Sequence, residues 1–210
     1  MIGPRRYLAA TTNEDKVREI RALLEGLPIE IVGLDRYPGI PPPDETGATF
    51  AENARLKALY YAAATGLPAI ADDSGLEIDA MNGAPGIESA RFGGVNSSYT
   101  EKFQLIYDTL RKVRRPESPA RFVCAVAVAD GHAIVFEGSG TVDGYIAVRP
   151  AGSGGFGYDP IFFYPPYGCT FAEVSPEQKA AVSHRGVAFR QLRAYLLDRL
   201  RPPGAGLKVG

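Results

Sequence analysis

The sequence predicts an α/β protein whose strands form one mixed sheet. Short apolar runs bounded by turn residues indicate strands, and segments with apolar residues at helical spacing separate several of them. Two β-rich runs flank Asp130 and Gly131, a dipeptide typical of a hairpin turn. Strands separated by helices and strands joined in a hairpin therefore occur in one chain, so we expect both parallel and antiparallel pairs.

The first predicted unit is a strand, a turn and a helix. Residues 6–10 form a short apolar run that indicates a buried strand, and the polar residues 11–15 form the turn after it. From Lys16 onward, apolar residues recur at helical spacing until Gly26 and Pro28, which end the predicted helix.

The second unit follows a loop. Prolines and glycines at residues 37–47 predict an exposed connection, and Thr49 begins a capping-box pattern, so the next helix should start there. Residues 69–71 predict a short buried strand that delivers the polar residues 72–74 at its end. A second, alternating run follows Gly75.

The middle of the chain predicts a helix and a long hairpin. A loop rich in Gly and Pro spans residues 83–94, and Thr100 is the expected cap of the helix after it. Residues 121–129 and 132–138 form the two arms of the predicted antiparallel hairpin. A further strand is expected near residues 141–148.

The last part of the chain predicts a glycine-rich loop and two helices. The loop spans residues 152–159 and leads into an aromatic run at residues 162–164. Ser175 begins a capping-box pattern with a proline at the first helical position. Ser183 precedes the amphipathic pattern of a terminal helix.

The domain organisation predicted from the sequence is simple. The chain has no internal repeat and no linker that would separate independent domains. At 210 residues it is long enough to bury a sizeable core. We expect residues 1–200 to form a single domain and residues 201–210 to form a flexible tail.

Composition and charge exclude several classes of protein. The chain has 23 Lys and Arg against 24 Asp and Glu, so it lacks the basic excess that stable binding to nucleic acid requires. Its longest apolar run, residues 122–129, is too short to span a membrane, and no secretory leader is recognisable. Cys124 and Cys169 show neither metal-pair nor disulfide spacing, so we expect a cytoplasmic protein.

The turn between the first strand and the first helix is a candidate phosphate cradle. Free backbone N–H groups and the helix dipole favour an anion at a helix N-terminus. The segment that offers them comprises Thr11, Thr12, Asn13, Glu14, Asp15 and Lys16. It lacks the glycines of a Walker motif, and ordinary helix capping by the same residues is the alternative.

Adjacent Asp72 and Asp73 form a candidate magnesium site. Two neighbouring carboxylates at the end of a buried strand require positive charge, and Mg²⁺ binds one or two carboxylates together with substrate phosphates. Glu45 on the proline-rich loop offers a further carboxylate, and Lys57, one turn from Asn53 on an apolar helix face, offers a cation for phosphate. A solvated Asp-Asp turn and a snorkelling lysine are the alternatives.

The glycine-rich loop and the start of the last helix form a candidate base site. The loop presents Phe156, whose ring can stack on a base. Lys179, His184 and Arg185 bring hydrogen-bond donors close together in the sequence. A tight turn with Phe156 in the core, and a capping role for His184 and Arg185, are the alternatives.

A series of short motifs occurs in a fixed order along nearly the whole chain. They are Thr-Thr-Asn-Glu-Asp-Lys at residues 11–16, Glu-Thr-Gly at 45–47, Glu-Asn-Ala-Arg-Leu-Lys-Ala at 52–58, Ala-Asp-Asp-Ser-Gly-Leu at 71–76, Gly-Ala-Pro-Gly-Ile at 83–87, Ser-Ala-Arg-Phe at 89–92, Gly-Gly-Phe-Gly-Tyr-Asp-Pro-Ile-Phe at 154–162, and Lys179 with Ser-His-Arg-Gly at 183–186. In this order they resemble the inosine/xanthosine triphosphate pyrophosphatase family. Thr12 stands where the family motif usually has glycine.

The resemblance implies a fold and a reaction. The fold is an elongated mixed β-sheet with flanking helices, in two lobes around a central nucleotide-binding cleft. The reaction is the magnesium-dependent hydrolysis of noncanonical purine nucleoside triphosphates (ITP, dITP and XTP) to the monophosphate and pyrophosphate, which clears them from the nucleotide pool. The enzyme is expected to be a homodimer.

The resemblance also assigns roles to residues of this chain. It assigns Asp73 and Lys57 to catalysis and Asp73, Glu45 and Asp72 to the metal. The substrate-binding residues are Thr11, Thr12, Asn13, Glu14, Asp15, Lys16, Ser74, Phe156, Gly157, Tyr158, Asp159, Lys179, His184 and Arg185. Phe156 is expected to stack on the purine, and donors at its edge should favour a 6-keto group over the amino group of adenine.

Three other functions fit parts of the pattern. A related nucleotide pyrophosphatase with another base preference would keep the same metal and phosphate chemistry. A nucleotide sensor without catalysis would keep the Phe156 loop and would not need Asp73. A purely structural or interaction protein would show no thermal shift with nucleotides. A turnover assay separates the enzymes from the other two.

Overall fold

One sheet of seven strands runs through residues 4–201, the part of the chain that the computed structural model describes. The strands are β1 (Arg5–Ala9), β2 (Ile29–Gly33), β3 (Ala69–Ile78), β4 (Pro119–Asp130), β5 (Ala133–Ile146), β6 (Phe162–Tyr164) and β7 (Cys169–Thr170). The α-helices are α1 (Glu14–Leu23), α2 (Phe50–Thr65), α3 (Tyr99–Lys112), α4 (Pro176–Val182) and α5 (His184–Arg199). Short 3-10 helices lie at Leu34–Arg36, Asp79–Met81, Gly86–Glu88, Asp159–Ile161, Pro165–Tyr167 and Phe171–Glu173.

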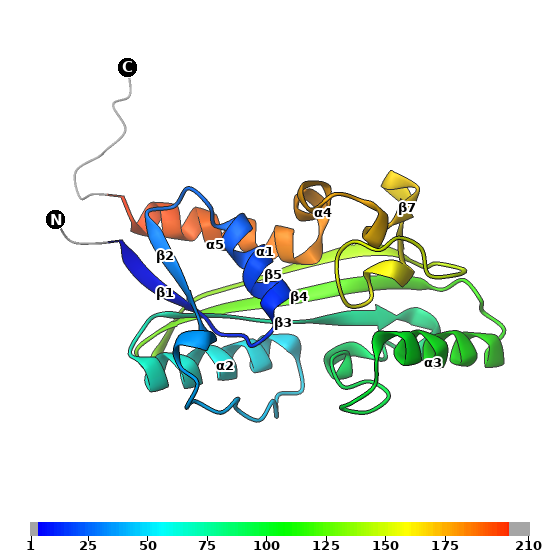
Figure 1. Cartoon of the computed structure of the whole chain (residues 1–210), viewed down its shortest axis with the longest axis horizontal. Coiled ribbons are helices and arrows are strands. Elements are labelled where there is room, and N and C mark those ends of the chain that lie inside the picture. Colours follow the sequence, from blue (N-terminus) through cyan, green and yellow to red (C-terminus); the bar gives the residue numbers. More distant parts are fainter. Residues whose placement is uncertain (1–3, 202–210) are drawn as a thin grey trace, which may run out of the picture.

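The strand pairing confirms the predicted mixed sheet. The strand order is β2-β1-β3-β4-β5-β6-β7. β1 pairs in parallel with β2 and with β3, whereas every later pair of neighbours is antiparallel. In Figure 1 the long strands β3, β4 and β5 follow the longest axis of the molecule, with α1 and α5 on one side of the sheet and α2 on the other. This is the elongated α/β architecture that the sequence predicts.

The hydrophobic core consists of three buried clusters. One packs α1 and α5 against the first half of the sheet; its members on and directly after these helices are Ile20, Leu24, Ala188, Phe189, Leu192 and Leu196. A second packs α2 on the opposite face, where small side chains let the helix approach closely; among them are Ala54, Ala58, Ala62, Ala69, Ala71, Ala125 and Ala127. The third fills the other half with α3 and several aromatic rings, including Phe103, Phe122, Phe162 and Phe171.

Three helix starts agree with the predicted caps. Thr49 Oγ1 accepts the N–H of Glu52 at 3.2 Å at the start of α2. Ser175 forms a capping box at the start of α4, and Ser183 Oγ accepts the N–H of Gly186 at 3.1 Å at the start of α5. Each hydroxyl satisfies a backbone donor that the first helical turn would otherwise leave unpaired.

Two helix starts differ from the prediction. α1 begins at Glu14, because the side chain of Asn13 accepts the N–H of Lys16 at 3.0 Å and so makes Asn13 the cap. α3 begins at Tyr99 and is capped by Ser98, so the prediction of Thr100 as the cap is wrong. Ser98 caps the helix in place of Thr100 because the side chains of Ser98 and Glu101 accept hydrogen bonds from each other's backbone N–H groups in a capping box.

Two strands are longer than predicted. β3 continues from Ala69 to Ile78, so residues 72–74 lie within the strand and not at its end. β5 likewise runs on to Ile146 and so includes most of the segment predicted as a separate strand near residues 141–148. Both extensions follow from β4, which is 12 residues long and pairs with β3 on one side and β5 on the other. Gly75 does not end β3: it allows a close approach, since a Cβ there would lie 2.4 Å from a backbone oxygen of Gly86.

The predicted ends of the domain lie at the limits of the described residues. Residues 202–210 fall outside them, so the predicted tail is described only at Arg201. A single domain over residues 1–200 stays a prediction. Within residues 4–201, no helix has the length and apolar character that a membrane span requires.

Candidate active site

A cleft with a volume of about 340 Å³ lies where most of the predicted site residues meet. That volume is in the range of small-molecule sites. The predicted residues that line it are Thr11, Thr12, Asn13, Lys16, Glu45, Lys57, Asp73, Ser74, Phe156, Gly157, Tyr158, Asp159, Lys179, His184 and Arg185. Glu14, Asp15 and Asp72 were predicted to belong to the site and do not line the cleft.

β3 separates the two adjacent aspartates, because successive side chains of a strand point to opposite faces. On the side of α1 and α5, Asp72 Oδ2 lies 3.1 Å from Lys16 Nζ and accepts a hydrogen bond from Arg185 Nη2 at 2.9 Å. On the side of α2, Asp73 Oδ1 accepts a hydrogen bond from Lys57 Nζ at 2.7 Å. The structure therefore does not bring Asp72 to the metal position predicted for it beside Asp73.

The surroundings shift the pKa values of the two aspartates in opposite directions. Burial acts to raise the pKa of Asp72, but the positive charges of Lys16 and Arg185 outweigh it and hold that pKa well below its ordinary value. Burial raises the pKa of Asp73, and the positive charge of Lys57 offsets this only in part. Asp73 is thus the stronger base of the two and the one that faces the cleft.

Lys57 joins Asp73 to Glu45. Its Nζ donates to Asp73 Oδ1 at 2.7 Å and to Glu45 Oε1 at 2.8 Å. One turn earlier on α2, Asn53 Nδ2 donates to the other oxygen of Asp73 at 3.4 Å. The side chain of Lys57 is only 11% exposed, so the snorkelling alternative is wrong for this lysine. Its ammonium lies in the cleft between two carboxylates.

Glu45 and Asp73 are the carboxylates that fit a divalent cation. Their oxygens already converge on one positive charge, the ammonium of Lys57. Residues 4–201 contain no group of three or more His, Cys, Asp or Glu side chains arranged to hold a metal. Mg²⁺ needs only one or two protein carboxylates when phosphates and water complete its coordination shell. The pair is therefore suited to a metal that binds together with a phosphate-bearing ligand.

The N-terminus of α1 lies beside these carboxylates. Asn13 caps the helix, as the alternative interpretation of this segment predicted, and both Asn13 and Lys16 line the cleft. Asp15 pairs with Arg18, and Glu14 is exposed. Neither acid lines the cleft, so the structure does not bring Glu14 and Asp15 to the position predicted for them, although the charge of Asp15 still acts on the cleft residue Tyr99.

Phe156 forms an aromatic wall at the other end of the cleft. Its half-buried ring has Lys179 Nζ at 4.5 Å and the Arg185 guanidinium carbon at 5.6 Å from the centroid. Asp159 Oδ2 accepts the N–H of Phe156 at 2.8 Å and so fixes the loop. Gly155 makes this contact possible: its φ is +64°, and a Cβ there would lie 2.1 Å from Asp159 Oδ2.

His184 is buried beside the cleft and uncharged at neutral pH. Its ring stacks on Phe122 with centroids 4.8 Å apart. Burial, together with the positive charges of Arg185 and Lys179, lowers the pKa of His184 well below its ordinary value. Its Nδ1 has no hydrogen-bond partner within residues 4–201. Nδ1 is itself enclosed by protein, and a neutral imidazole has one donor and one acceptor nitrogen.

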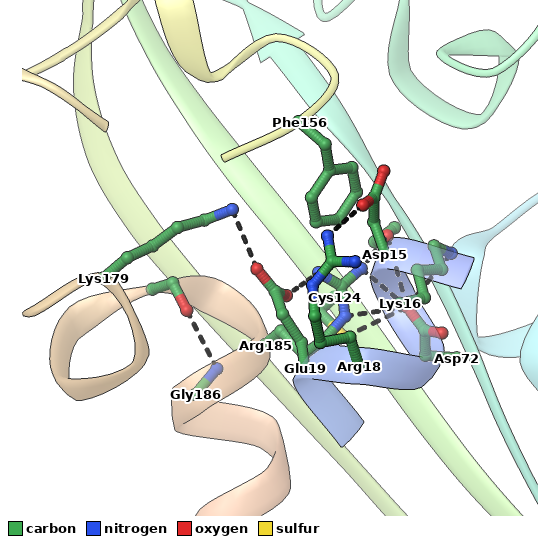
Figure 2. Close-up of polar contacts among 12 residues, drawn as sticks. Asp15, Lys16, Arg18, Glu19, Asp72, Cys124, Phe156, Lys179, Arg185 and Gly186 are labelled. Atoms are coloured by element: carbon green, nitrogen blue, oxygen red, sulfur yellow. Dashed lines mark hydrogen bonds and ion pairs between the residues drawn. The ribbon is translucent and has the colours of Figure 1, made fainter. Parts of the chain in front are cut away.

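A network of ion pairs connects this end of the cleft to α1, and Glu19 is its centre (Figure 2). Glu19 Oε1 lies 2.9 Å from Lys179 Nζ, and Glu19 Oε2 accepts from Arg185 Nη1 at 2.6 Å. Lys179 also donates to Asp159 at 2.5 Å. With Asp72 on β3, which also pairs with Arg185, the cations beside Phe156 are held by carboxylates on three elements, which fixes their positions.

Sequence reasoning missed three residues of this site. Glu19 was overlooked although it follows Lys16 by three positions, the spacing that puts two residues on one helix face. Arg91 occurs in a quoted motif, and its Nη1 lies 3.5 Å from Glu45 Oε2. Tyr99 lines the cleft and had no distinguishing pattern in the sequence.

Comparison with known proteins gives consistent matches along the chain. The model of the Ham1 family matches residues 7–195. A dITP/XTP pyrophosphatase of Streptomyces coelicolor is 49% identical over 191 residues, which cover 89% of this chain and 94% of the relative. Another, from Photorhabdus laumondii, is 45% identical over 200 residues, covering 93% and 98%. The solved structure of a HAM1 protein from Coxiella burnetii has a TM-score of 0.85 and 40% identity, covering 92% of this chain and 99% of that one.

The matches extend over enough of the chain to assign it to a family. The matched range, residues 7–195, includes every residue that lines the cleft. The similarity to the Coxiella burnetii structure extends over nearly the whole of both chains. The family that the ordered motifs resemble is thereby confirmed, and this chain belongs to the Ham1 family.

Proposed function

We propose that this protein hydrolyses the noncanonical purine nucleoside triphosphates ITP, dITP and XTP to their monophosphates and pyrophosphate. The proposal is supported by relatives at 44% to 49% identity that are named dITP/XTP pyrophosphatase. The observation that carries it is one cleft with a carboxylate and lysine cluster at one end and an aromatic wall with hydrogen-bonding groups at the other. Removing such nucleotides would keep them out of DNA and RNA.

Asp73 is the residue best placed to act as general base. In the proposed reaction a water oxygen forms a bond to the α-phosphorus and gives a proton to Asp73. The bond from the α-phosphorus to the oxygen bridging toward the β-phosphorus breaks, and pyrophosphate leaves with the electron pair. Burial raises the pKa of Asp73, which makes its carboxylate a stronger proton acceptor than an ordinary aspartate. Lys57, now between two carboxylates, would pair with the triphosphate.

Magnesium is the proposed cofactor, held by Glu45 and Asp73. When bound, it would neutralise charge on the phosphates and orient them. The phosphate tail would lie along Thr11, Thr12, Asn13 and Lys16, and Ser74 would be within reach of it. Arg91, which already approaches Glu45, brings a further positive charge to the same end.

The other end of the cleft would select the base. Phe156 would stack on the purine, and Asp159, Lys179, His184 and Arg185 would pair with its edge. A 6-keto group accepts hydrogen bonds, whereas the 6-amino group of adenine donates them. Buried donors left unpaired by adenine would cost binding energy, so ATP should be a poor substrate.

The homodimer and the cytoplasmic location stay part of this proposal. A purine nucleoside triphosphate is the proposed partner of the cleft, and no stable binding to nucleic acid is expected from a net charge of −1. Molecular mass in solution tests the dimer directly.

Product analysis tests the proposed reaction. ITP and ATP are incubated with the protein, with and without Mg²⁺, and mono- and diphosphate, pyrophosphate and phosphate are quantified. We expect IMP and pyrophosphate from ITP only with Mg²⁺, and almost no product from ATP. Formation of IDP and phosphate would place the attack on the γ-phosphorus. Failure to hydrolyse ITP, dITP and XTP would refute the proposal in favour of another base or a nucleotide sensor.

A further inference from the structure

Tyr99 lines the cleft from an element that carries none of the assigned site residues. It is the first residue of α3, directly after the cap Ser98. Ser98 donates its N–H to Glu101 Oε2 at 2.7 Å, and its Oγ accepts the N–H of Glu101 at 3.3 Å, so the backbone at this point is fixed. The side chain of Tyr99 is therefore presented to the cleft by a rigid helix start.

Three neighbours hold the ring of Tyr99 in one orientation. The ring of Tyr158 meets it edge-on, with centroids 5.3 Å apart and an interplanar angle of 90°. Phe103 packs on it with a centroid distance of 6.2 Å. Lys102 Nζ lies 4.8 Å from the centroid, and this buried ammonium donates to the backbone oxygen of Ala90 at 2.5 Å. The ring thus cannot swing away without breaking packed contacts.

The hydroxyl of Tyr99 is available to a ligand. The hydroxyl of the neighbouring Tyr158 donates to the backbone oxygen of Ser89 at 2.8 Å, whereas that of Tyr99 makes no hydrogen bond to the protein within residues 4–201, and Tyr99 is 40% exposed. It lies next to the loop that carries Phe156, because a Cβ placed on Gly157 would be 3.5 Å from the hydroxyl oxygen. Burial and the negative charges of Asp159 and Asp15 raise the pKa of Tyr99, so the group keeps its proton at neutral pH.

The position of this hydroxyl along the cleft follows from its neighbours. It lies against Gly157, which directly follows the proposed base-stacking residue Phe156. Tyr99 lines the same cleft as Asn13 and Lys16 at the phosphate end. In a nucleotide that spans the cleft, the part attached to the base, between it and the phosphates, is the sugar.

We propose that the Tyr99 hydroxyl hydrogen-bonds a sugar hydroxyl of the bound nucleotide. This inference rests on the proposed function, because it takes the base to lie on Phe156 and the phosphates at the start of α1. Tyr99 is then a substrate-binding residue that the α3 side of the cleft supplies.

The test compares Tyr99→Phe with the parent protein on three substrates: ITP, its 2′-deoxy form dITP, and 3′-deoxy-ITP. With ITP we expect KM to rise about threefold to tenfold, the range for losing one hydrogen bond, with kcat within about twofold of the parent. The rise should shrink to under about twofold for the deoxy substrate that lacks the partner hydroxyl. An equal rise with all three, or no rise with ITP, would overturn the inference.

A matched control is Tyr145→Phe. Tyr145 is 46% exposed and lies outside the cleft, so its variant also loses an exposed phenol hydroxyl. We expect its KM for all three substrates to equal that of the parent. Thermal unfolding of both variants should match the parent, because neither hydroxyl bonds to the described protein.

The test also separates failure of the inference from failure of the proposed function. If the parent hydrolyses none of the three substrates, the proposed function fails. Calorimetric binding of IMP, 2′-deoxy-IMP and 3′-deoxy-IMP to the parent and to Tyr99→Phe then decides the sugar contact without turnover. If Tyr99→Phe loses affinity only for the monophosphates that carry the partner hydroxyl, the sugar contact is supported. If its affinity for IMP equals that of the parent, the sugar contact is overturned.

Discussion

The two faces of β3 receive adjacent aspartates and use them differently. Asp72 is completely enclosed, and its Oδ2 is paired with Lys16 and Arg185. Asp73 faces the cleft, where Lys57 and Asn53 leave it 10% exposed. The same residue type, one position apart, thus has a lowered pKa on one face and a raised pKa on the other.

The two carboxylates differ in the number of cations that pair with them and in their access to the cleft. Asp72 has two charged partners and no access to the cleft, so its ionised form is part of the scaffold that holds Arg185. Asp73 is paired with one cation, Lys57, which also bonds to Glu45, and its side chain faces the cleft. An enclosed carboxylate that is paired with cations stabilises a fold. A carboxylate whose burial is only partly offset by nearby positive charge can accept a proton.

The sharpest test of this comparison is Asp73→Asn. An amide keeps the shape, and its oxygen can still accept from Lys57, but it cannot accept a proton from water. We expect ITP hydrolysis to fall by about 10²- to 10⁴-fold, the usual contribution of a general base. Circular dichroism and the denaturant midpoint should stay near those of the parent. Turnover within tenfold of the parent would remove Asp73 from its proposed role.

The matching change on the other face is Asp72→Asn. It leaves the buried cations Lys16 and Arg185 without their shared carboxylate, and breaking a buried ion pair from one side typically costs about 3–5 kcal/mol. We therefore expect a large loss in the free energy of unfolding, measured with urea. A variant as stable as the parent would contradict the structural role of Asp72 and reopen its assignment to the metal.

How much of this site the sequence predicts depends on the local pattern. The helix caps Thr49, Ser175 and Ser183 depend only on residues a few positions away, so the sequence predicts them. The separation of Asp72 from Asp73 could not, because it required knowing that β4 extends β3 beyond Ala71. Once a residue lies inside a strand, the pleat alone decides its face.

Residues joined only by tertiary contacts were the hardest to predict. Glu19 meets Arg185 across 166 positions of sequence, and no local pattern marks that pair. The family resemblance located the cleft residues because it compares whole chains and does not depend on local spacing. It also assigned Glu14 and Asp15 to substrate binding as part of a motif, although neither residue lines the cleft.

The two faces should also differ in their response to acid. Because the pKa of Asp72 is lowered in the folded protein, its ionised form stabilises the fold at pH values above the ordinary value of 3.8. That contribution is lost as pH falls from about this value toward the folded-state pKa. The free energy of unfolding should therefore decrease below about pH 4 in the parent and decrease less steeply in Asp72→Asn. Equal slopes would show that other carboxylates account for the acid sensitivity.

Glu19→Gln tests whether the scaffold face controls the base end of the cleft. Gln keeps the length but removes the charge that Lys179 and Arg185 share. We expect KM for ITP to rise about tenfold, with a smaller change in kcat, because each of the two cations beside Phe156 loses one of its two carboxylate partners. Glu25→Gln, an exposed residue just after α1, is the control and should behave as the parent. If KM for ITP is unchanged in Glu19→Gln, the network does not position the base site.

The smallest expected effect belongs to Thr12, which stands where the family motif usually has glycine. Within residues 4–201, Asn82 and Arg114 are the non-glycine residues with positive φ, so Thr12 occupies a conformation that a β-branched residue accepts without strain. Thr12→Gly should therefore relieve no backbone strain. It should increase the conformational entropy of the unfolded chain and so lower the free energy of unfolding by about 0.4–1 kcal/mol. Its kcat/KM for ITP should stay within about threefold of the parent, since the exposed hydroxyl contributes at most one hydrogen bond. A larger gain in kcat/KM would show that the phosphate end requires a closer backbone approach than Thr12 allows.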